Sequence, residues 1–190
     1  RQRQMCIRDS IKTVVITFAI MFAVIFLFRS FRSVGFGEAG VYFKTFGGGV
    51  VTDEPPKGEG LRFVLPWDDL YIYNVKQQEV FESKMKVLSS NGLDILLDIT
   101  VLYQPVYNEL GLLHQTKGFN YVDVVIKPAL RAISRSVVGN YTPEQLYSTK
   151  RDAIESEIEE RLVDNVQSQH VQINEVLVRD CLLYTSDAAD

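Results

Sequence analysis

Side chains that could do chemistry are few in this sequence and stand apart from one another. His114 and His170 are the only histidines, and neither has a second histidine at the short spacing of a metal site. Asp94 and Asp98 would share one face of a strand, where two carboxylates could transfer protons, although an exposed pair of this kind is more often solvated. The sequence contains no G-x-S-x-G or P-loop pattern. We therefore predict no catalytic residues, no metal site and no enzyme activity.

One glycine pattern matches a known cofactor sequence. Residues 35–40, GFGEAG, fit the dinucleotide-binding pattern G-x-G-x-x-G. That site needs glycines that follow a strand and open a helix, so that N–H groups at the helix start meet the pyrophosphate. Here the glycines follow an apolar helical run and lead into VYFKTF, which is typical of a strand. We therefore expect no nucleotide, and the sequence indicates no other cofactor.

The two ends of the chain carry related sequences. Residues 181–186, CLLYTS, can be encoded by TGT CTC TTA TAC ACA TCT. The complementary strand of that DNA encodes MCIRD, which is the sequence of residues 5–9. This inverted repeat resembles the adapter that transposon-based sequencing libraries attach to each fragment. We therefore expect residues 1–10 and 181–190 to be non-native translations, with the natural segment cut at both ends.

Cysteine content and net charge exclude further kinds of site and partner. Cys6 and Cys181 both fall in the expected adapter segments, so the natural segment would hold no cysteine for a disulfide, a nucleophile or a metal. The chain has a net charge of −4 and no basic stripe, which excludes nucleic acid as a partner. After the membrane segment described next, about 145 residues remain, enough for one domain core.

An apolar run near the N-terminus predicts a membrane anchor. Sixteen residues from Thr13 to Phe28, TVVITFAIMFAVIFLF, carry no charge. A helix needs about 20 apolar residues to cross the hydrocarbon of a bilayer, and Ile11 extends the run. Arg29 and Arg32 would mark the far interface. We expect a single transmembrane helix at residues 11–28. The predicted anchor residues are Thr13, Phe18, Phe22, Phe26, Phe28, Arg29 and Arg32.

Two other interpretations of this apolar run stay open. A core helix would have to hide an apolar surface on all sides within a small domain. A cleaved signal peptide would need small residues at a cleavage site, where this chain has FRSFRS. The arginines favour a cytoplasmic domain by the positive-inside tendency, but the opposite flank is missing, so the orientation stays open.

Short strands are predicted after the anchor, at residues 41–46, 50–52, 61–65 and 70–75. Glycine and proline turns such as DEPPKGEG separate them. The clearest pattern is a hairpin whose first strand alternates at positions 81, 83, 85 and 87. Asn91-Gly92 suits a tight turn, and every odd position from Leu93 to Tyr103 is apolar. This period of two predicts a half-buried strand.

Helical patterns follow the hairpin. Apolar residues from 122 to 137 recur at helical spacing, and Pro128 either kinks that helix or lies in the first turn of a new one. Thr142 and Gln145 predict a capping box that opens a helix ending at about Ser168. The apolar face of that helix is Leu146, Ile154, Ile158, Leu162 and Val166. Residues 171–178 return to strand with a bulge between positions 173 and 176. Strands followed by helices predict an α+β fold.

The order of these parts resembles the SPFH or band 7 domain, and most of all prohibitin. The best matching stretches are residues 37–46, 58–67, 93–105 and 126–146. The resemblance implies such a domain at residues 34–180, built from a mostly antiparallel sheet, packed helices and a final strand. The residues that match the family's motifs, all expected to be structural, are Gly58, Gly60, Pro66, Trp67 and Pro128.

The resemblance implies a membrane scaffold without catalytic residues. Such proteins form homo- or hetero-oligomers with other SPFH proteins, organise the lipid bilayer around them and often enclose membrane AAA proteases. The expected location is the bacterial cytoplasmic membrane or the mitochondrial inner membrane. Two alternatives stay open: a membrane-side adaptor for an enzyme whose catalytic region lies beyond Asp180, and a lipid-binding module without partners.

Overall fold

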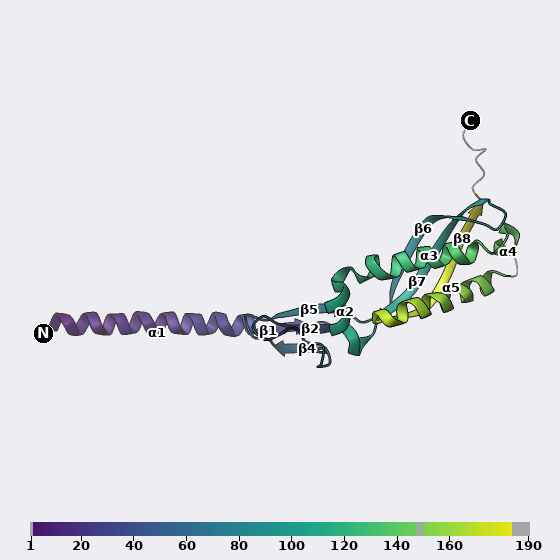
Figure 1. Cartoon of the computed structure of the whole chain (residues 1–190). Coiled ribbons are helices and arrows are strands. Elements are labelled where there is room, and N and C mark those ends of the chain that lie inside the picture. The colour runs from purple at the N-terminus through teal and green to yellow at the C-terminus, as the bar shows by residue number, and fades with distance from the viewer. Residues whose placement is uncertain (1, 148–149, 184–190) are drawn as a thin grey trace, which may run out of the picture.

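The protein is elongated, with a long helix at one end and two lobes beyond it (Figure 1). The structure is a computed structural model that describes residues 2–147 and 150–183. Helix α1 spans Gln2–Ser30. The near lobe, residues 31–75, contains β1 to β5, and the far lobe, residues 78–183, contains β6 to β8 and the remaining helices. The predicted α+β fold class is confirmed.

Helix α1 begins earlier and ends later than the helix expected at residues 11–28. The arginines and glutamines on either side of the apolar run favour the helical conformation, so charge alone does not end it. A side chain within the helix stabilises the last turn of α1: the Ser30 hydroxyl donates to the carbonyl of Phe26 at 2.8 Å.

Two small antiparallel sheets form the near lobe. Strand β1 (Phe31–Val34) pairs with β4 (Gly60–Phe63), and β2 (Glu38–Lys44) lies between β3 (Gly49–Val50) and β5 (Asp69–Asn74). Four of these strands overlap the expected ones with shifted ends. Strand β1 was not predicted, because its sequence FRSV has no period-two pattern. The core of the lobe contains Ala39, Val41 and Tyr73, each at most 4 % exposed.

One three-stranded antiparallel sheet forms the base of the far lobe. Strand β7 (Asp94–Pro105) lies between β6 (Gln78–Leu88) and β8 (Val171–Leu183). The odd residues of β7 from 95 to 103 are all buried, which confirms the predicted half-buried strand. The helical face of this sheet therefore holds the core.

The predicted alternation along β6 is wrong in its first half. A bulge lies between Glu82 and Met85, and Lys84 within it has a φ of 52°. One extra residue reverses which side chains face the core. Val80 is therefore buried and Phe81 is 49 % exposed, whereas Met85 and Val87 are buried as expected.

The turn of the β6–β7 hairpin is longer than the tight turn that Asn91-Gly92 predicted. Five residues, 89–93, separate the two strands. Only Gly92 has a positive φ, of 77°, whereas a tight turn of the predicted kind needs two such residues. The Ser89 hydroxyl and backbone close the loop through hydrogen bonds with Leu93.

Helices cover one face of the far-lobe sheet, with α3 against β6 and α5 against β8 (Figure 1). The helical elements are η1 (Tyr107–Glu109), α2 (Leu110–Lys117), η2 (Gly118–Asn120), η3 (Val122–Ile126), α3 (Lys127–Val138), α4 (Pro143–Tyr147), α5 (Arg151–Val166) and η4 (Gln167–Gln169). Pro128 lies in the first turn of α3, where its missing N–H costs nothing. The turn before it, η3, is a π-helix.

The predicted capping box is present at the start of α4. The Thr142 N–H donates to the Gln145 side chain at 3.1 Å, and the Gln145 N–H donates to the Thr142 hydroxyl at 3.4 Å. The single helix expected from here to Ser168 is instead two, because α4 ends at Tyr147 and α5 begins at Arg151. All five residues of the predicted apolar face are buried.

Side chains of α5 bind three backbone groups near the end of β8. The Arg151 guanidinium donates to the carbonyls of Val178 and Arg179, and the Val178 N–H donates to the Glu155 carboxylate at 3.0 Å. The expected bulge in this strand is confirmed, because Leu102 pairs with residue 175 and Tyr103 with residue 173. The helix therefore supplies partners that a fourth strand would otherwise provide.

Candidate membrane-contact surface

Helix α1 presents apolar side chains on all sides. The stretch Thr13–Ser30 is long and apolar enough to cross a membrane, and only 6 % of it is buried against the rest of the chain. The predicted anchor residues Phe18, Phe22 and Phe28 are 66 %, 65 % and 80 % exposed. This exposure argues against the interpretation of α1 as a core helix, whose apolar surface would be covered by protein.

Phe26 and Trp67 join α1 to the near lobe. Their ring centroids lie 6.0 Å apart at an angle of 59°, and Trp67 also contacts Phe46 edge-on at 6.4 Å. The predicted motif residue Pro66 lies beside this contact and lines a groove with α1. The Val64 N–H donates to the Ser30 carbonyl at 2.7 Å, so the helix end is also tied by the backbone. These contacts fix the near lobe at the exit of the apolar helix.

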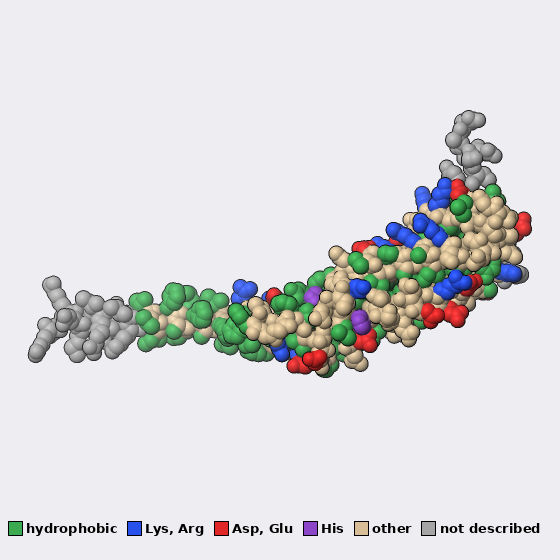
Figure 2. Space-filling model, viewed as in Figure 1, with side chains coloured by type: hydrophobic (Ala, Val, Ile, Leu, Met, Phe, Trp, Pro, Cys, Tyr) green, Lys and Arg blue, Asp and Glu red, His purple; other side chains and the backbone are tan. Residues whose placement is uncertain are grey.

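The apolar surface continues from α1 onto the near lobe (Figure 2). Phe31 and Phe63 face each other across β1 and β4 with ring centroids 5.9 Å apart, and both rings are about half exposed. Phe36 and Phe46 are more than 80 % exposed. Tryptophan and tyrosine are enriched where a membrane protein meets the water interface, and Trp67 lies against Phe46 in this lobe. An exposed apolar patch of this kind is typical of a surface that binds a membrane or another protein.

The predicted interface arginines, Arg29 and Arg32, lie where α1 gives way to β1. Both side chains are exposed. Arg29 is in the last turn of the helix, where a cation also interacts favourably with the helix dipole. The positions agree with the sequence-based expectation, and their contact with lipid stays a prediction.

The glycine motifs join segments within the near lobe. The Gly37 N–H donates to the Glu59 carboxylate at 2.8 Å, so the two glycine-rich segments bind each other. Gly60 has a φ of 101°, which other residues rarely adopt, and an added Cβ at Gly58 would lie 3.3 Å from the Tyr107 hydroxyl. Gly40 is within β2 rather than at the start of a helix. The expectation of structural glycines therefore has a geometric basis.

Other side chains considered for chemistry are not brought together. Asp94 forms an ion pair with Lys86 at 2.7 Å, and Asp98 accepts the Lys84 N–H in the bulge at 2.6 Å. His170 contacts Glu109 at 2.8 Å, in a left-handed position at the end of η4. Within residues 2–147 and 150–183, no group of three or more His, Cys, Asp or Glu could hold a metal ion.

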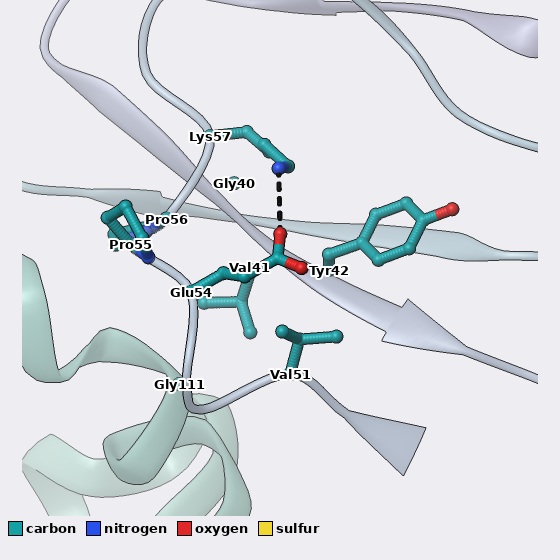
Figure 3. A pocket seen from close by; sticks show the side chains of 9 residues that line it. All are labelled: Gly40, Val41, Tyr42, Val51, Glu54, Pro55, Pro56, Lys57 and Gly111. Carbon is teal, nitrogen blue, oxygen red and sulfur yellow. Dashed lines mark hydrogen bonds and ion pairs between the residues drawn. The ribbon is translucent and has the colours of Figure 1, made fainter. Parts of the chain in front are cut away.

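A hollow beside the DEPPKGEG loop is drawn in Figure 3. Its polar feature is an ion pair between Lys57 and Glu54, at 3.1 Å, above the backbone of β2. The interior volume of about 10 Å³ is no larger than one water molecule requires. The hollow is therefore too small for a substrate.

An aromatic cluster around His114 forms the joint between the two lobes. The Tyr73 hydroxyl lies 2.7 Å from Nδ1 of His114, and the Tyr71 ring stacks on the imidazole at 4.4 Å. Phe119 stacks on Tyr73 at 4.9 Å. Burial lowers the pKa of His114, and burial, with a smaller contribution from Tyr121, raises the pKa of Tyr73 to about 12. Both groups are therefore held neutral near pH 7.

Sequence reasoning missed this cluster and considered His114 only as a histidine without a second histidine at metal-site spacing. Its members come from β5, α2 and η2, which no local pattern connects. The available signal was the alternation of Tyr71 and Tyr73, which indicates only a strand.

Comparison with known proteins gives a consistent result. The family model for the SPFH domain / Band 7 family matches residues 32–183. Prohibitin-4, mitochondrial, of Arabidopsis thaliana is 25 % identical over 151 residues, which cover 78 % of this chain and 52 % of that protein. Prohibitin-2 of Dictyostelium discoideum is 27 % identical over 122 residues, covering 63 % of this chain and 41 % of its own length. The chain thus spans about half the length of the curated relatives it matches.

Proposed function

The chain belongs to the SPFH domain / Band 7 family, and we propose that it acts as a membrane-anchored scaffold with no catalytic activity of its own. In this proposal α1 crosses the bilayer once, with its anchor at residues 11–28, and the SPFH domain at residues 34–180 rests on one membrane surface. The near lobe contacts the lipid interface, and the far lobe extends into the aqueous phase.

A single observation carries the proposal: the exposed apolar surface of α1 is followed, beyond Arg29 and Arg32, by exposed aromatic side chains of the near lobe. Phe28, Phe31 and Phe63 are at least 49 % exposed. Leaving such rings in water forfeits the free energy of apolar burial, about 25 cal/mol per Å². A bilayer covers both the helix and the rings at once, which a single soluble partner for either element would not do.

We propose that the scaffold consists of several copies, alone or with other SPFH proteins. Anchoring confines the domains to two dimensions and raises their effective concentration, so weak lateral contacts can hold an assembly. The matched relatives are prohibitins, and three of them, all of Arabidopsis thaliana, are named mitochondrial, which supports a mitochondrial membrane. The location that we propose is the mitochondrial inner membrane or, alternatively, a bacterial cytoplasmic membrane. Organisation of the surrounding lipid and regulation of a membrane AAA protease are the roles that we propose for the assembly.

The anchor is tested by alkaline carbonate extraction of membranes that contain the full chain. We expect wild-type protein to stay in the pellet. A Phe22→Asp/Ile25→Asp variant should be extracted, because each charge at the centre of a membrane helix costs about 3 kcal/mol. Phe81→Asp/Leu88→Asp, which places the same two charges at exposed apolar positions of the far lobe, should stay in the pellet. Extraction of the wild type would contradict the anchor.

The assembly is tested separately by chemical cross-linking in native membranes. We expect ladders of cross-linked copies or of copies with another SPFH protein, and a co-purifying AAA protease if the regulatory role is correct. A dispersed monomer would contradict the scaffold while leaving the anchor intact. An assembly that recruits no protease would favour lipid organisation as its role.

A further inference from the structure

An apolar groove lies between α1 and the loop after β4. Phe22, Ile25 and Phe26 line it from the helix, and Pro66 and Trp67 line it from the loop. Its volume is about 260 Å³. The helix residues recur at the spacing of one helical face, so the groove runs along α1. Its only charged lining residue is Arg29, one turn nearer the helix exit than Ile25 and Phe26.

Two further arginines face each other at the helix exit. Arg32 of β1 and Arg62 of β4 are direct partners across the antiparallel pair. Like charges in this position destabilise a sheet. The Arg62 guanidinium donates to the carbonyls of Gly58 and Glu59 at 3.0 and 3.2 Å, which uses some of its donors and leaves its charge uncompensated. In the part of the chain that the structure describes, no carboxylate forms an ion pair with Arg29, Arg32 or Arg62.

These cations lie where an anion would be found if α1 is in a bilayer. The apolar stretch ends at Ser30, with Arg29 just before it on the helix and Arg32 just after it on β1, on the face of the strand pair opposite Phe31 and Phe63. This is the depth of lipid phosphates, and anionic lipids attract basic residues next to a membrane helix. The helix dipole explains a cation at Arg29, but it does not explain why Arg32 and Arg62 are paired across β1 and β4.

We propose that the groove and the arginines at the helix exit form a binding site for anionic phospholipid of the surrounding bilayer. The acyl chain lies along Phe22 and Phe26 under Trp67, and the headgroup phosphate is met by Arg29 at the end of the groove. Arg32 and Arg62 attract the net charge of the headgroup from the strand pair next to the helix exit. Guanidinium groups suit this role because one guanidinium can donate two parallel N–H hydrogen bonds to two oxygens of a phosphate. The inference rests on the proposed function, since it requires α1 to be in the membrane.

Trp67 is the only tryptophan of the chain and lines the groove, so its fluorescence reports on the lipid at this site. The full chain is reconstituted into phosphatidylcholine bilayers that contain brominated phosphatidylglycerol or, in parallel samples, brominated phosphatidylcholine. Bromine quenches tryptophan on contact, and the two titrations give the relative affinity of the site for anionic over neutral lipid. We expect a ratio on the order of tenfold or more at low salt.

Matched variants separate a phosphate site from general attraction. The triple variant Arg29→Gln/Arg32→Gln/Arg62→Gln should bring the ratio close to one, and the corresponding triple lysine variant should keep a clear preference because it keeps the charge. A control with Lys84→Gln/Arg135→Gln/Lys150→Gln removes the same charge from exposed positions of the far lobe and should leave the ratio unchanged. Far-UV circular dichroism checks that each variant is folded.

The outcomes distinguish a failure of the lipid site from a failure of the membrane scaffold on which it rests. Equal quenching by both lipids in the wild type, or an unchanged ratio in the glutamine variant, overturns the lipid site and leaves the membrane scaffold standing. An equal fall in the ratio with the far-lobe control also overturns it, because the preference would then follow net charge alone. An absence of quenching by either lipid places Trp67 outside the bilayer and overturns the placement of the near lobe as well.

Discussion

Replacing Tyr73 with Phe tests the joint between the lobes, because it removes one hydroxyl group and keeps the ring. Tyr73 is 4 % exposed, and its hydroxyl lies 2.7 Å from Nδ1 of His114. The change leaves the imidazole nitrogen without its partner, and an unsatisfied buried group costs about 1–3 kcal/mol. His114 is half-buried rather than fully buried, so water can compensate in part. We therefore expect a loss of about 1–2 kcal/mol in the free energy of unfolding.

The assay is urea unfolding of the full chain in detergent micelles, followed by far-UV circular dichroism. A double-mutant cycle with His114→Leu isolates the pair from the packing that each single change also disturbs. The double variant should cost about 1 kcal/mol less than the sum of the two single changes, because both hydrogen-bonding groups are then absent. Costs that add to within about 0.3 kcal/mol would refute a coupled pair at this joint.

Further changes test other parts of the fold by the same unfolding assay. Because burial lowers the pKa of His114 below its ordinary value of about 6.5, stability should be full above that pH and fall as the pH drops through it towards the lowered value; a flat profile in the wild type would contradict this. Thr142→Ala removes one half of the capping box and should cost about 1 kcal/mol, whereas no change would mean that the cap is not formed. Ile158→Ala, at a fully buried position, should cost about 2–5 kcal/mol, against less than about 0.5 for the exposed control Glu160→Ala. Lys84→Gly should leave stability unchanged or raise it by up to about 1 kcal/mol, since glycine suits the φ of 52°, and a clear loss would argue against the left-handed bulge.

The elements that were predicted well from the sequence are those that pack one face against the core along their whole length. Strand β7 packs one face on the core throughout, so its odd residues had to be apolar. Helix α5 likewise buries Ile154, Ile158, Leu162 and Val166 at regular spacing. The capping box was predictable because all of its groups lie within four residues.

The elements that the sequence missed depend on single insertions or distant contacts. The bulge at Lys84 reverses the phase of β6, and nothing in the surrounding alternation marks it. Strand β1 forms only because β4 returns to pair with it. The exposed ring of Phe63 lies in a predicted strand, where an apolar residue normally faces a core, and Phe31 lies in a segment for which no strand was predicted. The anchor was predictable from composition alone, but the groove that Trp67 forms with it was not.

The local interruption of both edges of the far-lobe sheet has a consequence for a protein held at high density in a membrane. An open edge strand offers unpaired N–H and C=O groups to any neighbour, and strands from identical chains can then add to one another without limit. Arg151 and Glu155 occupy three of those groups near the end of β8, and the left-handed Lys84 interrupts β6 at one place. An incoming strand therefore cannot pair along the whole length of either edge, which opposes the continuous strand addition that builds fibrils.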